Sequence, residues 1–386
     1  MQELFIRKDS MRFRGLSLNF LSQNMEKLLS HLDKFKPKTF NVALMPDFFL
    51  DRFVSWDGDA KEFSNRILEV AKRKGGSIDN VAQMDFGGGN AVNTAAALAL
   101  LEVNVFPIVC ASKLGLSLLK LHLQPLHINL IHVKIKNKAS ITTALELTYG
   151  KEKRNIMLRD LGSLEEFGPT SLSEEDFALI EKVDFVCVFN WAGTRRHGTE
   201  LAKAMFQHVK TRGTGKTYYD TADPLSNKPE IPKLVKEVLL YPNLIDILSL
   251  NENEAITYAK HVAPKETNKL QKQHKTMPAL AKECAKILAQ RLTSRIDLHT
   301  TTYSATFTKN KHAIVPALKV RTLRATGAGD AWNAGNIYAD ANDFSDNLRL
   351  TFANAVAAHY LSSPTGEHPQ LAQLQDFLRQ TLSQRH

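Results

Sequence analysis

The sequence contains few cysteines, no long apolar run, and little glycine or proline for its length. Its three cysteines, Cys110, Cys187 and Cys284, are odd in number and lack the spacing of a metal site, so we expect a reducing, cytoplasmic location. The 19 glycines and 14 prolines in 386 residues exclude collagen-like and low-complexity chains. No apolar run approaches the roughly 20 residues that span a bilayer, and we expect no membrane partner.

Acidic residues are also fewer than basic ones, 40 against 50, and the formal net charge is +10. This balance favours anionic ligands, either nucleic acid or phosphorylated metabolites. The densest basic run, residues 265–275, lies in a polar stretch without interleaved aromatic residues, and no nucleic-acid-binding motif occurs. We therefore expect a small-molecule substrate and no nucleic acid partner. Hydrophobic residues make up 43% of the chain, as in soluble globular proteins.

Short apolar runs alternate with longer helical periods along most of the chain, as they do in βαβ units. This pattern predicts an α/β fold: a three-layer sandwich with a central, mostly parallel sheet. Segments near 52–86 and 128–160 do not fit it, and we expect them to form a small β lid with one solvated face. We divide the chain into an N-terminal extension (1–40) with one amphipathic helix, a main domain (41–375) and a C-terminal tail (376–386).

The most informative motif is the small-residue stretch 326–335, Thr-Gly-Ala-Gly-Asp-Ala-Trp-Asn-Ala-Gly. A helix is expected to begin within it, so the free amides of Gly327, Ala328 and Gly329 would form a cradle for a phosphoryl group. Asp330 stands at the mouth of that cradle, where its charge would repel phosphate. Its position makes sense for a base that accepts a proton from an attacking hydroxyl. The alternative is an ordinary Gly-rich turn in which Asp330 caps the helix.

Two weaker motifs precede this stretch. Gly88 and Gly89 stand before an Ala/Leu-rich helix and allow close approach of a ligand, while Asn93 offers an amide donor and acceptor. Tight packing of helix on sheet is the alternative interpretation. Residues 251–254, Asn-Glu-Asn-Glu, directly follow an apolar strand. Carboxylates and amides at the carboxyl end of a strand can hold Mg²⁺ through water, or they can cap the next helix.

Taken in order, these three motifs resemble the signatures of the ribokinase-like, or phosphofructokinase-B, family of carbohydrate and nucleoside kinases. The segment 45–52 is similar to the family's first strand, which ends in a substrate-binding aspartate, and Asp51 is the best match. Residues 353–358, which include Asn354, and the pair Thr365-Gly366 are similar to the segment that lines the nucleotide base. The resemblance covers residues 41–370 and implies a ribokinase-like sandwich with a lid.

The resemblance implies a kinase that transfers the γ-phosphoryl group of ATP to a hydroxyl of a sugar, nucleoside or related polyol. It also implies Mg²⁺ and pairing of lids in a homodimer. From it and the motifs we assign three groups of site residues. The catalytic group is the base Asp330 with the anion hole of Gly327, Ala328 and Gly329. Acceptor-binding residues are Asp51, Gly88, Gly89, Asn93 and Asn190. Nucleotide-binding residues are Asn251, Glu254, Thr326, Asn354 and Gly366, with Glu254 holding Mg²⁺ through water.

Two departures from the family pattern bear on the site. Arg324 and Ala325 stand where relatives carry Asp-Thr, and that aspartate helps many relatives bind a monovalent cation, so a requirement for potassium is in doubt. We hypothesise that Arg324 supplies a fixed positive charge near the nucleotide. Residues 300–304 replace a Gly-containing turn that contacts the nucleotide. These departures leave open an alternative function, a catalytically silent sensor of a sugar or nucleotide on the same fold.

Overall fold

Eight strands form the central sheet of the computed structural model, which describes residues 19–126, 128–150, 152–324 and 326–384. The strand order is β14-β13-β12-β11-β10-β9-β1-β4. From β4 to β12 all neighbours are parallel, and β13 and β14 are antiparallel to theirs. The mostly parallel sheet predicted from the sequence is thus confirmed. The strands are β1 (Asn41–Met45), β4 (Asn104–Pro107), β9 (Phe185–Phe189), β10 (Lys216–Asp220), β11 (Ile247–Leu250), β12 (Arg295–His299), β13 (Tyr303–Phe307) and β14 (His312–Pro316).

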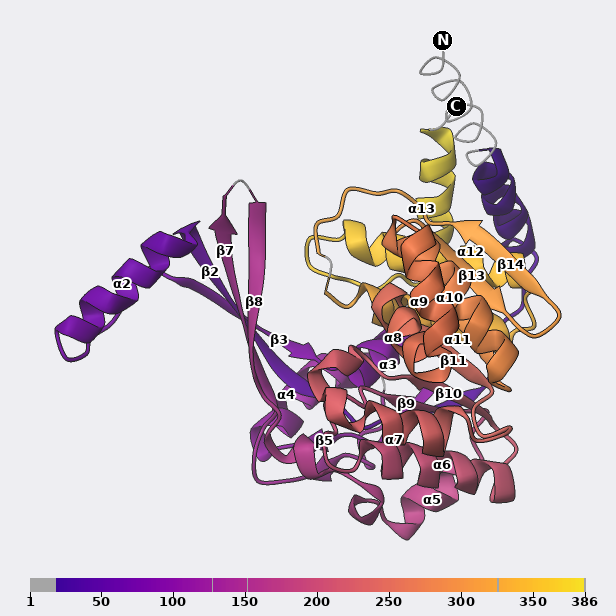
Figure 1. The fold of residues 1–386 in the computed structure, drawn as a ribbon, viewed down its shortest axis with the longest axis horizontal. Helices are drawn as coiled ribbons and strands as arrows, with labels where there is room; N and C mark the ends of the chain where they lie inside the picture. The colour runs from indigo at the N-terminus through magenta and orange to yellow at the C-terminus, as the bar shows by residue number, and fades with distance from the viewer. Residues whose placement is uncertain (1–18, 127, 151, 325, 385–386) are drawn as a thin grey trace.

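Helices cover both faces of this sheet (Figure 1). Successive strand residues alternate between two cores, so Leu44 packs in one and Met45 in the other. The first core includes residues 19–32, α3 (Asn90–Leu100), α4 (Lys113–Leu123), α11 (Ala328–Ala341), α12 (Asp346–Ser362) and α13 (Leu371–Ser383). The second includes α5 (Glu174–Ile180), α6 (Gly198–Arg212), α7 (Ile231–Leu234), α8 (Glu252–Val262), α9 (Pro264–Gln273) and α10 (Met277–Arg291).

The expected amphipathic helix of the N-terminal extension is present over residues 19–32 in the described part of the chain. It buries Met25 and Leu28 completely in the first core. It lies beside α13 (Figure 1), and Arg379 of α13 forms an ion pair of 2.9 Å with Asp33. Because α13 runs continuously across position 375, no break separates a C-terminal tail there, contrary to our expectation.

A second sheet, in the order β3-β2-β7-β8, projects from the body (Figure 1). It is the small lid sheet expected from the sequence. Its strands are β2 (Phe49–Asp59), β3 (Ala82–Gly88), β7 (Ile141–Tyr149) and β8 (Glu152–Asp160). The short strands β5 (Cys110–Ala111) and β6 (Lys134–Ile135) pair separately.

The lid differs from the expectation in two ways. A helix, α2 (Ala60–Lys72), is inserted in its first segment, and it begins because the Asp59 carboxylate accepts hydrogen bonds from the amides of Lys61 and Glu62. In the second segment, residues 128–133 alternate in polarity but form no strand. There Ile128 packs into the body instead.

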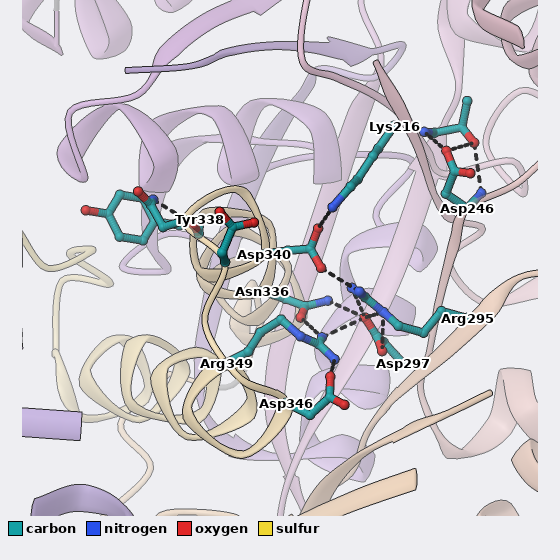
Figure 2. Close-up of polar contacts among 12 residues, drawn as sticks. Lys216, Asp246, Arg295, Asp297, Asn336, Tyr338, Asp340, Asp346 and Arg349 are labelled. Carbon is teal, nitrogen blue, oxygen red and sulfur yellow. Dashed lines mark hydrogen bonds and ion pairs between the residues drawn. The ribbon is translucent and has the colours of Figure 1, made fainter. Parts of the chain in front are cut away.

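A buried charge network anchors α11 and α12 to the sheet (Figure 2). Asp297 on β12 is fully buried and accepts hydrogen bonds of 2.9 Å from Arg349 and 2.8 Å from Asn336. Arg295 bonds Asp297 and also pairs with Asp340 on α11. The two guanidinium groups hold the pKa of Asp297 well below its usual range, against the opposing effect of burial. The network thereby fixes the helix that carries Asp330.

No helix in the described ranges combines the length and the hydrophobicity needed to cross a bilayer.

Candidate active site

The parallel strands of the central sheet end at one edge, where polar side chains gather. Asp47 follows β1, Asn190 follows β9, Asp220 ends β10, Asn251 follows β11 and His299 ends β12. In open α/β sheets this edge is where ligands bind. Both glycine motifs start helices here, α3 and α11.

Two of the motif glycines are required by backbone conformation and by space. Gly327 has a φ of +94°, and a Cβ atom there would lie 2.3 Å from the Tyr360 hydroxyl oxygen. Gly89 has a φ of +102°, and a Cβ atom would lie 2.7 Å from the carbonyl oxygen of Asp47. Any other residue would be strained at either position. Both helices can therefore begin close to their neighbours, with their first amides directed at the strand ends.

The structure brings the two glycine motifs into direct contact through Asp330. One carboxylate oxygen of Asp330 accepts a hydrogen bond of 2.7 Å from Asn90 Nδ2, and the other accepts one of 2.8 Å from Asn93 Nδ2. Thr94 Oγ1 lies 3.4 Å from the Asp330 carbonyl oxygen, to which it donates. Residues that are far apart in the sequence thus form one constellation, and Asp330 occupies its centre.

Asp330 is a buried carboxylate with an unusual affinity for protons. Burial, followed by the negative charges of Asp220 and Asp47, raises its pKa to about 8, although hydrogen bonds from Asn93 and Asn90 oppose the rise. Such a group can take a proton near neutral pH, which an ordinary carboxylate does poorly. The position and the pKa both suit a general base.

If Asp330 is the general base of the predicted kinase, its pKa sets the pH dependence of kcat/KM. A base must be deprotonated to act, so kcat/KM should rise about tenfold per pH unit below pH 8 and level off above it. Replacing Asp47 with Asn removes one of the charges that raise the pKa, and the midpoint should then move to lower pH. Initial rates at subsaturating acceptor from pH 6 to 9.5 measure both effects. A flat profile in the wild-type protein would exclude Asp330 as the titrating base.

Asp47 has a role that the sequence interpretation missed. Its buried carboxylate accepts hydrogen bonds from the first amides of α3, at 2.8 Å from Asn90 and 2.9 Å from Ala91. Asn190 Nδ2 donates a third, also at 2.8 Å. The amide nitrogen of Asn190, predicted to bind the acceptor, is therefore bonded to Asp47, while its Oδ1 is enclosed without a partner. Asp47 orients the turn from which Asn90 and Asn93 reach Asp330.

Asp51, the predicted acceptor aspartate, lies on the lid strand β2 and bonds Thr142. A Cβ atom on Gly88 would lie 2.0 Å from Asp51 Oδ2, so the absence of a side chain at Gly88 makes room for this carboxylate. Burial and the charge of Asp47 raise the pKa of Asp51, and the nearby cations Arg159 and Arg324 lower it. Unlike Asp47, Asp51 is only half-buried, and it is the more available of the two for a ligand hydroxyl.

The N-terminus of α11 is open to an anion. Gly327 occupies the cap position and no side chain caps this end, so the first amides of the helix lack an intrahelical partner. Beside them, the His299 ring packs against the Trp332 ring at a tilt of 31°, with 4.9 Å between the ring centroids, and His299 Nε2 is enclosed without a partner. Burial lowers the pKa of His299 in spite of its acidic neighbours, so the imidazole is neutral near pH 7. A neutral imidazole can donate one hydrogen bond beside the amide cradle.

A cavity of about 540 Å³ opens from this cradle. Its lining includes His299, Gly329, Trp332, Asn354 and Ala358. The Asn354 side chain is bonded within the protein, since Oδ1 accepts from Ser304 and Trp332 and Nδ2 donates to the carbonyl oxygen of Pro316.

Two residues that were predicted to bind the nucleotide, Thr326 and Gly366, lie outside this cavity. Thr326 is exposed and its carbonyl accepts from the Tyr360 hydroxyl at 2.6 Å. Gly366 packs against Arg324. Neither is among the residues that line the cavity.

The sequence profile of the pfkB family of carbohydrate kinases matches residues 64–370. The chain belongs to this family. Membership makes it, in general terms, a sugar or nucleoside kinase, as the resemblance of its motifs implied. No curated protein is significantly similar to it in sequence.

Solved structures of several sugar and nucleoside kinases share the fold. A nucleoside kinase from Methanocaldococcus jannaschii is 15% identical, with a TM-score of 0.63 over 89% of this chain and 100% of its own. An Arabidopsis thaliana ribokinase, solved with ribose and ATP, is 16% identical, with a TM-score of 0.63 over 89% of this chain and 99% of its own. An adenosine kinase from Sinorhizobium meliloti is 14% identical, with a TM-score of 0.64 over 89% of this chain and 99% of its own. At these identities the likeness shows the fold alone.

Glu254 and the carboxylates near it are the residues that would hold a hydrated Mg²⁺ in this pfkB kinase. Glu254 is buried, and burial and the charges of Asp220 and Asp223 raise its pKa. Asn251 donates hydrogen bonds to both Glu254 carboxylate oxygens, from Nδ2 at 2.7 Å and from its backbone N–H at 2.8 Å. These bonds cap the next helix, which was the alternative interpretation of this motif. Within the described ranges, no three acidic, His or Cys side chains are grouped to hold a metal directly. The negative charges that surround Glu254 are those of Asp220, Asp223 and Glu252, and such a group of carboxylates suits a cation held through water.

Proposed function

We propose that this chain transfers the γ-phosphoryl group of ATP to a hydroxyl of a sugar, nucleoside or related polyol, with Asp330 as the general base. The observation that carries the proposal is the position of Asp330, held by Asn90 and Asn93 at the open N-terminus of α11. A carboxylate with a raised pKa thus lies between the acceptor motif and a cradle of free amides. Both parts are needed for phosphoryl transfer to an alcohol.

The reaction follows from this arrangement. The hydroxyl oxygen of the acceptor forms a bond to the γ-phosphorus of ATP while Asp330 takes the proton of that hydroxyl. The bond between the γ-phosphorus and the β,γ-bridging oxygen breaks, and this oxygen leaves with ADP. The amides of Gly327, Ala328 and Gly329 stabilise the charge on the transferring group, and one such donor is typically worth ~3 kcal/mol. The neutral His299 donates to a phosphate oxygen in the cavity. Mg²⁺, held through water near Glu254, would offset the phosphate charge.

Asp51 and Asn93 hold the acceptor in this proposal, below the lid sheet. We expect Asp51→Ala to raise the KM for the acceptor about ten- to a hundredfold, since a hydrogen bond to a charged group is worth ~1.5–3 kcal/mol. The effect on kcat should be smaller, because Asp51 does not contact the transferred proton. Steady-state kinetics with varied acceptor measures the split.

Asp57→Ala is the matched control for Asp51→Ala, because Asp57 lies on the same strand but is exposed. It should leave both constants unchanged. An Asp51→Ala variant with an unaltered acceptor KM would show that the acceptor binds elsewhere.

In this proposal the lid sheet, whose strand β2 carries Asp51, bounds the acceptor side of the site and would exclude water from the transfer. Its outer strand β8 is exposed along its whole length and presents Ile156, Met157 and Leu158. These exposed apolar side chains are consistent with the homodimer through the lid that the resemblance implies.

A nucleotide-consumption screen tests the proposed activity. Purified protein is incubated with ATP and MgCl₂ and, one at a time, with sugars, nucleosides and inositols, and the Asp330→Asn variant serves as the blank. We expect at least one polyol to stimulate ADP formation in the wild-type protein alone. Binding of a polyol and of ATP, seen by calorimetry, without turnover by any compound would support the silent sensor instead.

A further inference from the structure

Arg324 lies where the lid, the anion-hole turn and the C-terminal part of the chain meet. Its guanidinium carbon is 4.4 Å from the centre of the Phe86 ring and 5.5 Å from that of Phe53, both on lid strands. Its Nη1 donates to the carbonyl oxygen of Thr365 at 3.3 Å. Gly366 has a φ of +70°, and a Cβ atom there would lie 2.8 Å from Arg324 Cδ. The turn at Thr365 and Gly366 is therefore shaped around the arginine.

The positive charge of Arg324 is not neutralised by a salt bridge with any described carboxylate. Its Nε is enclosed and has no hydrogen-bond partner. The charge of Arg324 acts to lower the pKa of Asp51 and of Tyr360, against the larger effect of burial. The Tyr360 hydroxyl in turn donates to the carbonyl oxygen of Thr326 in the anion-hole turn. Burial, with the charge of Arg324, lowers the pKa of His368 to about 3, so that neighbour is neutral. Arg324 thus places a permanent cation close to Tyr360, which bonds the turn that ends at Gly327.

The residues around Arg324 do not fit a bound monovalent cation. Such an ion needs several oxygen ligands, and the resemblance implies that relatives supply one from a carboxylate at this position. Here the position holds a guanidinium, which repels a second cation and already occupies the carbonyl oxygen of Thr365. The aromatic rings of Phe53 and Phe86 cover its face and offer no oxygen.

We propose that Arg324 is a built-in cation: it supplies the charge behind the anion hole without a bound ion, and it ties the lid to the anion-hole turn. The inference rests on the proposed kinase function. A guanidinium stays protonated across the physiological range and cannot dissociate, unlike a bound ion. Its stacking on Phe53 and Phe86 adds a link that an ion cannot make, because cation–π contacts join the turn to the lid. The enzyme should therefore work without potassium or sodium.

The first test uses the wild-type protein. Turnover and thermal unfolding are compared in KCl, NaCl and choline chloride at equal ionic strength, with the acceptor found by the screen. We expect equal turnover and equal unfolding temperatures in the three salts, within about twofold for the rate. Activation by KCl of about tenfold or more over choline chloride would overturn the proposal.

The second test introduces the carboxylate that relatives carry. We expect Arg324→Asp to lose about a hundredfold in turnover in choline chloride, as when an anion-hole charge is removed. KCl should restore part of the loss and raise the unfolding temperature of this variant alone. Arg321→Asp, an equal charge change at an exposed position of the same segment, is the control. If both variants behave alike in the three salts, Arg324 has no such role.

The two proposals can fail separately. A wild-type protein that turns over no acceptor in any salt refutes the kinase function, and the unfolding temperatures still report on the cation site. A KCl-specific rise in the unfolding temperature of the wild-type protein would refute the role of Arg324 even then. If Arg324→Asp does not fold, Arg324→Lys replaces it: a lysine keeps the charge and should retain turnover in choline chloride better than Arg324→Gln.

Discussion

Replacing Asp330 with Asn should reduce kcat by at least about a hundredfold, because a general base contributes roughly 10²–10⁴-fold. Asn has nearly the same shape and can still accept a hydrogen bond from Asn90 or Asn93, but it cannot take the proton from the acceptor. The affinity for ATP should change little, since the amides of Gly327 to Gly329 remain in place. Steady-state kinetics and calorimetric titration with ATP measure the two effects. Turnover close to that of the wild-type protein would refute the base assignment.

The same variant has an independent signature in stability. Folding raises the pKa of Asp330 from its ordinary value to about 8, so between about pH 4 and 8 the folded state binds more protons than the unfolded state. In this window the wild-type protein loses stability as the pH rises. Asn does not titrate. The unfolding free energy of Asp330→Asn should therefore increase, relative to that of the wild-type protein, as the pH rises from about 4 to 8. Denaturant unfolding at several pH values reports this difference and also shows that the variant folds.

Arg349→Met should cost about 3–5 kcal/mol of unfolding free energy, as when one partner of a buried ion pair is removed. Arg349 is 1% exposed and donates to Asp297, which is fully buried. Without Arg349 only Arg295 remains to balance Asp297, and the attachment of α12 to α11 through Asn336 is lost as well. Urea unfolding at pH 7 measures the loss. Because the pKa of Asp297 is held low, the contribution of this pair is present above about pH 4 and should fade as the pH falls.

Arg379→Met provides the matched control, since it removes an arginine from an exposed ion pair with Asp33. Exposed pairs contribute about 0–1 kcal/mol. The two variants should thus differ by at least ~2 kcal/mol. If they were equally stable, the network in Figure 2 would not anchor the helix that carries Asp330.

Part of the candidate site was predictable because it follows from chain direction. Asn190 and Asn251 each follow a parallel strand, so both were expected at the carboxyl edge of the sheet. The two glycine motifs instead follow β3 and β14, which are antiparallel to their neighbours, so the hydrogen bond from Asn93 to Asp330 is a result of the fold. The helix around residues 19–32 was predictable from its apolar period, which buries Met25 and Leu28.

Other features depend on contacts that no local pattern records. Asp47 and Asp51 are four residues apart in one segment, and only the fold shows that Asp47 is saturated by the α3 amides while Asp51 stays available. His299 ends a strand that also carries Arg295 and Asp297, and its closeness to Gly329 arises from the packing of α11. Likewise, Arg324 contacts Phe53 and Phe86, which are far from it in the sequence, only in the folded chain.

Single-turnover kinetics tests the central claim most directly. Excess enzyme is mixed with acceptor and with ATP labelled in its γ-phosphoryl group, quenched at short times, and analysed for labelled acceptor. In the wild-type protein we expect the label to pass to the acceptor, and in Asp330→Asn we expect the rate constant of this step to fall at least about a hundredfold with both ligands bound. Equal rate constants, or label found only in free phosphate, would contradict proton removal by Asp330 in a kinase.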